Sequence, residues 1–231
     1  RDLSQAESRL VYMFTKEPEL MDLARTMPWE YDDHTAVAAI IFDVTTDDVT
    51  KEQRYFGKKT NHASNYDMKG KKGAEEILKD GYVISGDEFQ EMIDRKMAAR
   101  PAIKDVFQAE TRRTIITHKK LSNTWGRTLD FTMQRINQDT FREGYAFRAA
   151  SEVAGIINQY GVIPFWQRYK RDPDVRLRIQ MHDELVISCK PTRAWEVVER
   201  NQLIFVWHHA ENKPPDWELP LLSEFGDPEW T

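Results

Sequence analysis

The chain has 231 residues, of which 40% are hydrophobic and 11% aromatic, and its formal net charge is −5 at pH 7. This composition is typical of a folded globular chain and excludes an intrinsically disordered one. No apolar run approaches the roughly 20 residues that cross a bilayer, so we expect neither a membrane span nor a membrane partner. The single cysteine, Cys189, excludes an internal disulfide and a Cys-based zinc site, and it fits a reducing compartment.

Helices dominate the first 119 residues. Their predicted ranges, in order, are 6–14, 36–42, about 51–68, 74–79, 86–99 and 101–119. Thr50 and Gln53 have the spacing of a capping box, which opens the helix over 51–68. We expect Gly70 and Gly73 to end that helix, because glycine is common at helix ends.

The second half of the chain mixes helices and strands. A loop or short hairpin is predicted over 121–131, a long helix over about 140–160, and a further helix near 193–210. Apolar alternation predicts strands over 175–181 and 184–189, joined by a tight turn at His182-Asp183. The predicted fold class is α+β, mostly helical, with a small antiparallel β-sheet.

The turn His182-Asp183-Glu184 places carboxylates at a sheet edge. Adjacent carboxylates repel unless a cation neutralises them, and Mg²⁺ prefers such hard oxygen ligands. Asp2, ahead of the first helix, and Glu7, in that helix, supply further carboxylates. Two Mg²⁺ ions between Asp2 and Asp183 would suit phosphoryl transfer. An incidental Asp-Glu turn and an ordinary acidic helix start are the alternatives.

The segment from Lys51 to Lys72 is strongly basic in an acidic chain. It has seven Lys and Arg residues against two acidic ones. Within it, side chains recur every four residues and form one stripe along a helix. The stripe consists of Arg54, Lys58, His62 and Tyr66. Two cations and two rings suit a triphosphate and a base, whereas a solvated amphipathic helix is the alternative.

Three segments in this order resemble the motifs of family A DNA polymerases. They are Asp2-x-Ser4-Gln5-x-Glu7-x-Arg9 (motif A), Arg54-x-x-x-Lys58 with Tyr66 (motif B), and His182-Asp183-Glu184 (motif C). The resemblance covers nearly the whole chain, and its details are similar to phage members. It implies a mostly helical fingers subdomain (32–130) inserted in a palm (1–31 and 131–231) with a small antiparallel sheet.

The activity implied by the resemblance is template-directed DNA synthesis with two Mg²⁺ ions, for which Mn²⁺ could substitute. Asp2, the Leu3 carbonyl and Asp183 would hold the ions, with Glu184 in support. Arg54 and Lys58 would hold the dNTP triphosphate, and Lys58 would protonate the leaving pyrophosphate.

The resemblance also implies contacts to the sugar, the bases and the DNA. Glu7 would exclude a ribose 2′-hydroxyl, and Tyr66 would stack near the templating position. The nucleotide site would further include Gln5 and His62. The residues expected to contact primer–template DNA are His182, Arg127 and Arg142.

Three positions depart from the family's pattern. His62 stands where Phe or Tyr is usual, Asp67 where Gly is expected, and Ala149 or Ala150 where a Gln is expected. These departures put sugar discrimination, the end of the fingers helix and sensing of the DNA minor groove in doubt. None removes an expected metal ligand.

The chain starts where the strand leading into motif A should already have begun. We therefore expect an N-terminal fragment or subunit of the same polymerase, carrying the thumb and the rest of the palm, as a partner. The expected location is the cytoplasm of a phage-infected bacterium. A non-catalytic nucleic-acid-binding remnant is the alternative function, and a two-metal nuclease ranks last because it leaves the basic stripe unexplained.

Overall fold

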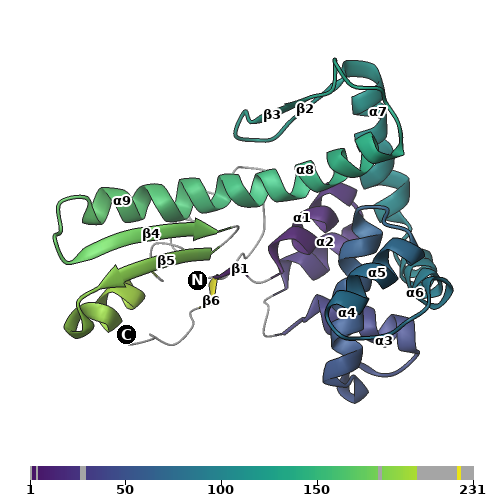
Figure 1. The fold of residues 1–231 in the computed structure, drawn as a ribbon, viewed down its shortest axis with the longest axis horizontal. Coiled ribbons are helices and arrows are strands. Elements are labelled where there is room, and N and C mark those ends of the chain that lie inside the picture. The colour runs from purple at the N-terminus through teal and green to yellow at the C-terminus, as the bar shows by residue number, and fades with distance from the viewer. Residues whose placement is uncertain (1, 4, 27–29, 182–183, 202–222, 225–231) are drawn as a thin grey trace.

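The computed structural model describes residues 2–3, 5–26, 30–181, 184–201 and 223–224 (Figure 1). The first seven α-helices are α1 (Ala6–Thr15), α2 (Pro18–Arg25), α3 (Asp33–Phe42), α4 (Lys51–Asn65), α5 (Gly70–Lys79), α6 (Gly86–Ala99) and α7 (Ala109–His118). They are followed by α8 (Gln138–Ile156), α9 (Ile163–Tyr169) and a helical segment over 194–201. Short helical turns are η1 (Thr46–Asp48), η2 (Ile103–Gln108), η3 (Ile157–Val162) and η4 (Pro191–Arg193). No helix among these residues combines the length and apolarity that a membrane crossing requires.

The strands of the described residues form three antiparallel pairs. These are β1 (Asp2–Leu3) with β6 (Ser223–Glu224), β2 (Lys120–Ser122) with β3 (Thr128–Asp130), and β4 (Val175–Met181) with β5 (Glu184–Cys189). The predicted α+β class and the ranges of β4 and β5 are confirmed.

A continuous helical rod made of α8, η3 and α9 runs along the molecule (Figure 1). Helices α1 to α6 gather at one end of this rod, and the β4–β5 hairpin lies along the other, with β1 between them (Figure 1). The rod is longer than the predicted helix over 140–160, because it has no break at its π-helical turn η3 and continues to Tyr169.

Separate apolar cores hold these parts together. The largest joins α1, α2, η2 and α8 around Tyr12, Phe107 and Tyr145. A second core joins α4, α5 and α6 around Phe89, and a third packs α9 against β4 around Phe165. The α4–α6 lobe therefore has a core of its own.

The prediction that Gly70 and Gly73 end the basic helix is wrong. Helix α4 ends at Asn65, and both glycines belong to α5, which begins four residues earlier than expected. A Cβ at Gly70 would collide with the backbone of Gly86, and one at Gly73 with the ring of Phe89. These glycines permit close packing of α5 on α6.

The capping box of α4 is confirmed. The hydroxyl of Thr50 accepts from the backbone of Gln53, and the Gln53 side chain accepts from the backbone of Thr50. Gly57 allows α4 to approach α3 closely, since a Cβ there would overlap the His34 carbonyl. Helix α4 is thus held firmly against α3.

Two local features differ from the sequence pattern. Helix α2 was not predicted, although Pro18 stands at its first position and Glu17 caps it by accepting from the Leu20 amide at 2.8 Å. In β4 the alternation is broken by a bulge between Leu177 and Ile179, where the pairing register shifts.

Candidate functional site

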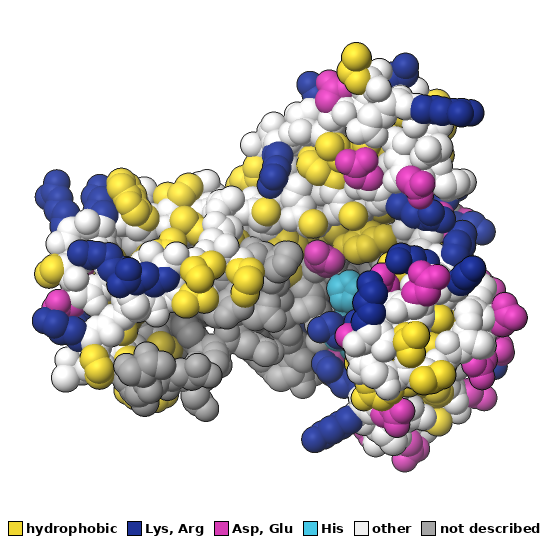
Figure 2. Space-filling model, viewed as in Figure 1, with side chains coloured by type: hydrophobic (Ala, Val, Ile, Leu, Met, Phe, Trp, Pro, Cys, Tyr) yellow, Lys and Arg dark blue, Asp and Glu magenta, His cyan; other side chains and the backbone are white. Residues whose placement is uncertain are grey.

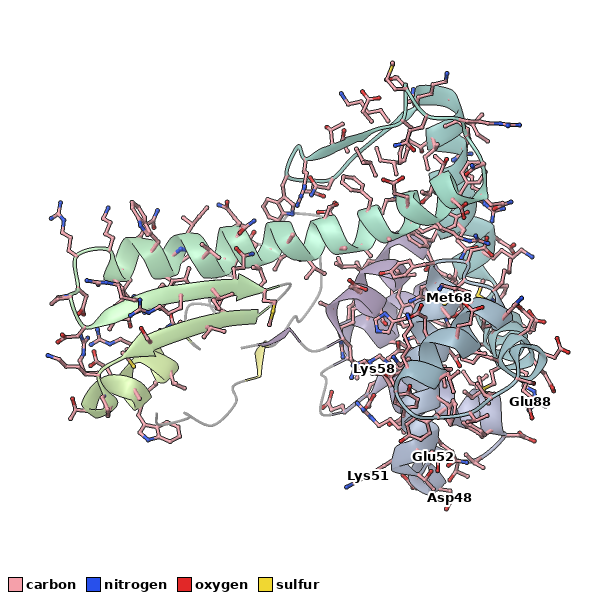
Figure 3. All side chains as sticks on the ribbon, viewed as in Figure 1. Asp48, Lys51, Glu52, Lys58, Met68 and Glu88 are labelled. Atoms are coloured by element: carbon pink, nitrogen blue, oxygen red, sulfur yellow. The ribbon has the colours of Figure 1, made fainter. Side chains whose placement is uncertain are left out.

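The four stripe residues lie on the face of α4 that is open to solvent. Arg54 and Lys58 are exposed, and His62 and Tyr66 are half-buried. The opposite face of the helix is buried, and it consists of Gly57, Thr60, Asn61 and Ser64. Figure 2 shows Lys and Arg side chains with a His along the edge of this lobe nearest the strands, and Figure 3 places Lys58 there.

Arg54 is oriented by Asp32, the residue that caps α3. The guanidinium contacts the Asp32 carboxylate from Nε at 2.7 Å and from Nη2 at 2.6 Å. Partial burial acts to raise the pKa of Asp32, but the hydrogen bond and charge of Arg54, together with the Thr35 amide, hold this pKa below its usual value. Lys58, in contrast, makes no ion pair within the described part of the chain.

Glu7 connects helix α1 to the end of the stripe. Its Oε2 accepts from the Tyr66 hydroxyl at 2.7 Å and lies 3.7 Å from Nδ1 of His62. Burial, together with the Glu7 charge, raises the pKa of Tyr66. Burial lowers the pKa of His62, although the Glu7 charge opposes this shift. The structure thus brings Glu7 of α1 to His62 and Tyr66 of α4, although 59 positions separate Glu7 from Tyr66.

The Gln5 side chain forms hydrogen bonds with the first residues of α3 and its cap. Its Oε1 accepts from the Asp33 amide at 2.9 Å, and its Nε2 donates to Asp32 at 3.4 Å. Its backbone has a positive φ of 54°. Both polar ends of the side chain are engaged, and its role in nucleotide binding stays a prediction.

Two of the expected metal ligands, Asp2 and Leu3, lie on a described strand. Strand β1 bears Asp2 and Leu3, and it lies against β5, which begins at Glu184. His182 and Asp183 lie outside the described residues. Within the described ranges, no group of three or more His, Cys, Asp or Glu side chains is arranged to hold a metal ion. The metal ligands therefore stay predictions.

The two other expected DNA contacts lie on separate elements. Arg127 is exposed at the turn of the β2–β3 hairpin. Arg142, in the second turn of α8, donates from Nε to the carbonyl of Asp67 at 3.0 Å and from Nη1 to Asp139 at 2.9 Å. The two arginines therefore lie on different elements of the fold.

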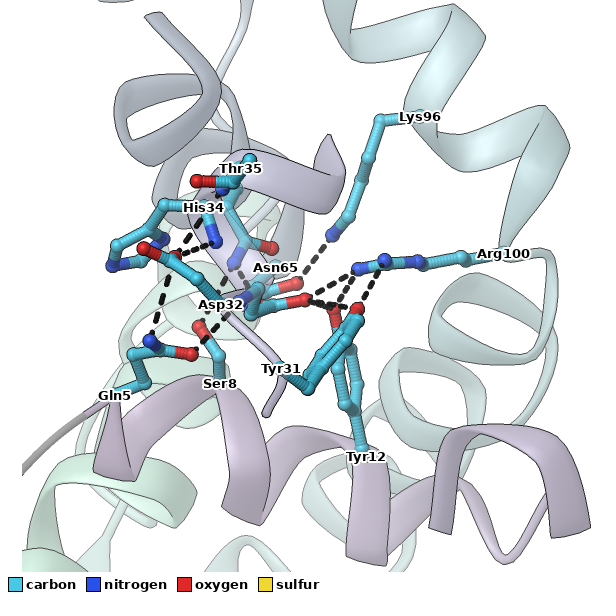
Figure 4. A network of polar contacts seen from close by, with 12 residues as sticks. Gln5, Ser8, Tyr12, Tyr31, Asp32, His34, Thr35, Asn65, Lys96 and Arg100 are labelled. Carbon is cyan, nitrogen blue, oxygen red and sulfur yellow. Dashed lines mark hydrogen bonds and ion pairs between the residues drawn. The ribbon is translucent and has the colours of Figure 1, made fainter. Parts of the chain in front are cut away.

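The structure contains a buried polar network that we did not predict (Figure 4). At its centre is Asp33, whose side chain is 1% exposed. Its Oδ1 accepts from Tyr12 at 2.6 Å, from Tyr31 at 3.0 Å and from Arg100 at 2.8 Å. Its Oδ2 accepts a short hydrogen bond from Asn61 of α4. Burial raises the pKa of Asp33.

Lys96 of α6 extends the network from the other side. It is fully buried and donates to Oδ1 of Asn65, at the end of α4, at 2.6 Å. Burial lowers the pKa of Lys96 to about 7, and the charge of Asp33 acts against this shift. The network therefore ties α1, α3, α4 and α6 together through charged groups that are withdrawn from water.

The sequence carried little signal for this network. Asp32-Asp33 has the pattern of an ordinary helix start, and Arg100-Pro101 that of a helix boundary, so neither pair signals a buried contact. Only the fold brings Asp33 and Arg100 within 2.8 Å, although 67 positions separate them in the chain. Lys96 stands among several other charged residues of the helix over 86–99, so its burial has no sign in the sequence, and Lys is rarely fully buried.

His34 makes the stability of this region depend on pH. The side chain is 6% exposed, and burial lowers its pKa from 6.5 to about 4. Because the folded pKa is depressed, its contribution to stability is present above pH 6.5 and is lost as the pH falls toward 4. When the pH falls from 7.5 to 5, the free energy of unfolding should decrease in both proteins. We expect the decrease to be about 1–2 kcal/mol smaller in His34→Gln than in the wild type.

Urea denaturation at the two pH values measures this difference. His118→Gln is the control, because His118 is exposed and should keep the wild-type pH dependence. Identical pH profiles for His34→Gln and the wild type would contradict the assignment.

A model described as DNA polymerase family A matches residues 1–213. DNA polymerase I of Helicobacter pylori (strain J99) is 27% identical over 207 residues, which are 88% of this chain and 22% of that protein. The DNA polymerase of Bacillus phage SP01 is 23% identical over 230 residues, which are 96% of this chain and 24% of that protein. The chain thus spans less than a quarter of each.

A solved structure shares the fold. It is the POL domain of Pol1 from M. smegmatis in complex with DNA primer-template and dNTP, with a TM-score of 0.74 and 21% identity. The similarity covers 95% of this chain and 37% of that one.

Proposed function

The chain belongs to DNA polymerase family A, and from this we propose that it carries the nucleotide-binding and catalytic part of a template-directed DNA polymerase. It would transfer a nucleotide from a dNTP to the 3′-hydroxyl of a primer. The relatives are named as DNA polymerases, and the similar solved domain is named as a complex with primer-template and dNTP. The observation that carries the proposal is the exposed stripe of α4 beside the Glu7–Tyr66 hydrogen bond.

Charge and geometry support the nucleotide site. Lys58 is exposed and has no carboxylate partner in the described ranges, so it is available to a triphosphate. Arg54, held at one end by Asp32, has a fixed guanidinium fork suited to phosphate oxygens. The Glu7 carboxylate, near His62 and Tyr66, would lie at the sugar and exclude a 2′-hydroxyl.

We assign the metal site to Asp2, the Leu3 carbonyl and Asp183, with Glu184 beside them. The placement of β1 against β5 supports this assignment, since β1 carries Asp2 and Leu3 and β5 begins directly after Asp183. Two bound Mg²⁺ ions would neutralise charge on the phosphates and orient the attacking and leaving oxygens. The chain's own contribution would be to position the triphosphate and the primer end.

The proposed subdomains follow from the family resemblance. Residues 32–130 would be the fingers, and residues 1–31 and 131–231 the palm. The separate core shared by α4, α5 and α6 supports a distinct fingers unit. The chain spans less than a quarter of the length of each of the two polymerases described above. We propose that a thumb and further palm strands come from polypeptide outside it, and that the assembly acts in the cytoplasm of an infected bacterium.

Lys58→Ala tests the proposal. If Lys58 holds the triphosphate and protonates the pyrophosphate, its loss should lower kcat for primer extension about 100-fold, the low end for a general acid. The control is Lys51→Ala, a variant at the exposed start of the same helix, which should stay within twofold of the wild type.

The assay follows incorporation of each dNTP opposite each template base, with Mg²⁺, in the assembled polymerase. Incorporation of the complementary nucleotide supports the proposal. Duplex binding without any templated incorporation would refute it in favour of a non-catalytic remnant, and equal kcat values for the two lysine variants would refute the role of Lys58.

A further inference from the structure

Asp67, directly after the stripe, has an unusual backbone. Its φ is +56°, in the left-handed region that an aspartate seldom adopts. The residue lies two positions after the end of α4, in the link to α5, which Met68 marks in Figure 3. Contacts from the surrounding structure stabilise such a conformation.

Three cations from three different elements converge on Asp67. Lys69 Nζ lies 2.7 Å from Oδ1, and Arg112 Nη2 of α7 lies 3.5 Å from Oδ2. Arg142 of α8 donates from Nε to the Asp67 carbonyl at 3.0 Å. We call these three residues the cation cluster. One carboxylate thus sits where three positively charged side chains meet.

The two arginines of the cluster have contacts other than the Asp67 carboxylate. Arg112 lies over the rings of Phe141 and Tyr145, at 5.7 Å from each centroid, and donates a short hydrogen bond to the Tyr145 hydroxyl. Arg142 is held from its outer side by Asp139 at 2.9 Å. These contacts would keep both guanidinium groups in place if the Asp67 carboxylate moved away.

The cluster also opens to solvent. The Asp67 side chain is 17% exposed, whereas those of Arg112 and Arg142 are each 34% exposed and that of Lys69 is 61% exposed. Lys69 and Arg112 line a cavity of about 390 Å³ together with Lys104, and its carboxylates are Asp67 and Asp94. Without the Asp67 charge, this cavity would carry three cations against one anion.

We propose that the cation cluster is a binding site for a phosphodiester of a single-stranded DNA segment, and that the Asp67 carboxylate occupies this site when no strand is bound. A carboxylate and a phosphodiester both offer anionic oxygens to a guanidinium fork, so each can replace the other. An incoming strand must displace Asp67, which lowers the affinity of the site. The inference rests on the proposed function, since it assigns the strand to the template.

A strand fits this site better than a free nucleotide does. Arg54 and Lys58 already take up the triphosphate in the proposed function, and α4 rises about 16 Å between Arg54 and its end, at 1.5 Å per residue. A single dNTP held at Arg54 would not bring its phosphates to Asp67. A nucleic-acid backbone, with a phosphate at every nucleotide, reaches that distance.

Two substitutions at Asp67 test the inference without disturbing the backbone. Asp67→Gly and Asp67→Asn both remove the charge, and both residues tolerate positive φ. Each variant should bind a primer–template with a single-stranded template overhang about threefold to fivefold more tightly, the effect expected for removal of one ion pair near a surface. Binding to the blunt duplex should not change.

Fluorescence anisotropy with labelled DNA measures these affinities in the assembled polymerase. Asp94→Asn is the matched control, because Asp94 lines the same cavity and makes no ion pair in the described part of the chain. It should leave affinity for the overhang within twofold. Adding Lys69→Gln to Asp67→Asn should reverse the gain.

Three outcomes would overturn the inference. They are unchanged affinity in both Asp67 variants, an equal gain in Asp94→Asn, and a gain that pyrophosphate abolishes as effectively as single-stranded DNA does. The last outcome would assign the cluster to free phosphates. Failure of the proposed function gives a different result. The wild type would then show no templated incorporation, while the DNA affinities of the wild type and the variants could still be compared.

Discussion

Asp33→Ala should lower the free energy of unfolding by about 3–5 kcal/mol, the usual cost of removing one partner from a buried ion pair. The substitution leaves Arg100, which is 5% exposed, without the carboxylate that it contacts at 2.8 Å. It also deprives fully buried Lys96 of the nearby negative charge that supports its protonated form. The buried Arg100 cation would then lack compensation, and Lys96, whose pKa burial lowers to about 7, would be shifted further toward its neutral form.

The loss should exceed that of an exposed ion pair in the same lobe. Asp80→Ala is the control, since Asp80 pairs with Lys59 at 2.6 Å but is 42% exposed. Removing an exposed pair costs about 0.2–1 kcal/mol. Denaturation in urea at pH 7.5 measures both variants, and a loss below 1 kcal/mol for Asp33→Ala would mean that the network does not stabilise the fold.

The buried network also links helix α1 to helix α4, which carries the proposed nucleotide-binding stripe. It joins Tyr12 of α1 to Asn61 and Asn65 of α4, and the Glu7–Tyr66 bond joins the same two helices at the stripe. The network therefore orients α4 relative to the strand β1 that precedes α1. We expect Asp33→Asn, which keeps the shape and loses the charge, to be less destabilised than Asp33→Ala.

Asp183→Ala should abolish Mg²⁺-dependent primer extension, with a fall in kcat of about 1,000-fold or more. Metal ions in such sites supply several kcal/mol of charge stabilisation, and each 1.36 kcal/mol is a factor of ten in rate. Asp2→Ala should have an effect of the same order, because both carboxylates are expected to hold the ions. Primer extension with saturating dNTP and Mg²⁺ measures the loss.

Stability separates a catalytic role of Asp183 from a structural one. Adjacent carboxylates repel each other when no cation is bound, so Asp183→Ala should not lower the unfolding free energy measured without Mg²⁺. The control is Asp174→Ala, at the start of the same hairpin, where Asp174 pairs with Lys190 at 2.9 Å. That variant should retain wild-type kcat. More than a tenth of wild-type kcat in Asp183→Ala would remove it from the metal site.

The sequence by itself determined the features that depend on near neighbours in the chain. The capping box of Thr50 and Gln53, the ranges of β4 and β5, and the common face of the stripe all follow from local spacing and period. The family followed from three motifs in a fixed order, which the match over residues 1–213 supports. These features are predictable because each cap, strand, helix face or single motif depends on residues that are close together in the sequence.

Only the tertiary structure decided which charges are buried and which partners they meet. Asp33 and Arg100, or Asp67 and Arg142, lie 67 and 75 positions apart and carry no local sign of their contact. Gly70 and Gly73 were misassigned for the same reason, since their role depends on the Phe89 ring and on the backbone of α6. The free energy of a charge depends on its distance from water and from other charges, and both distances are properties of the folded chain.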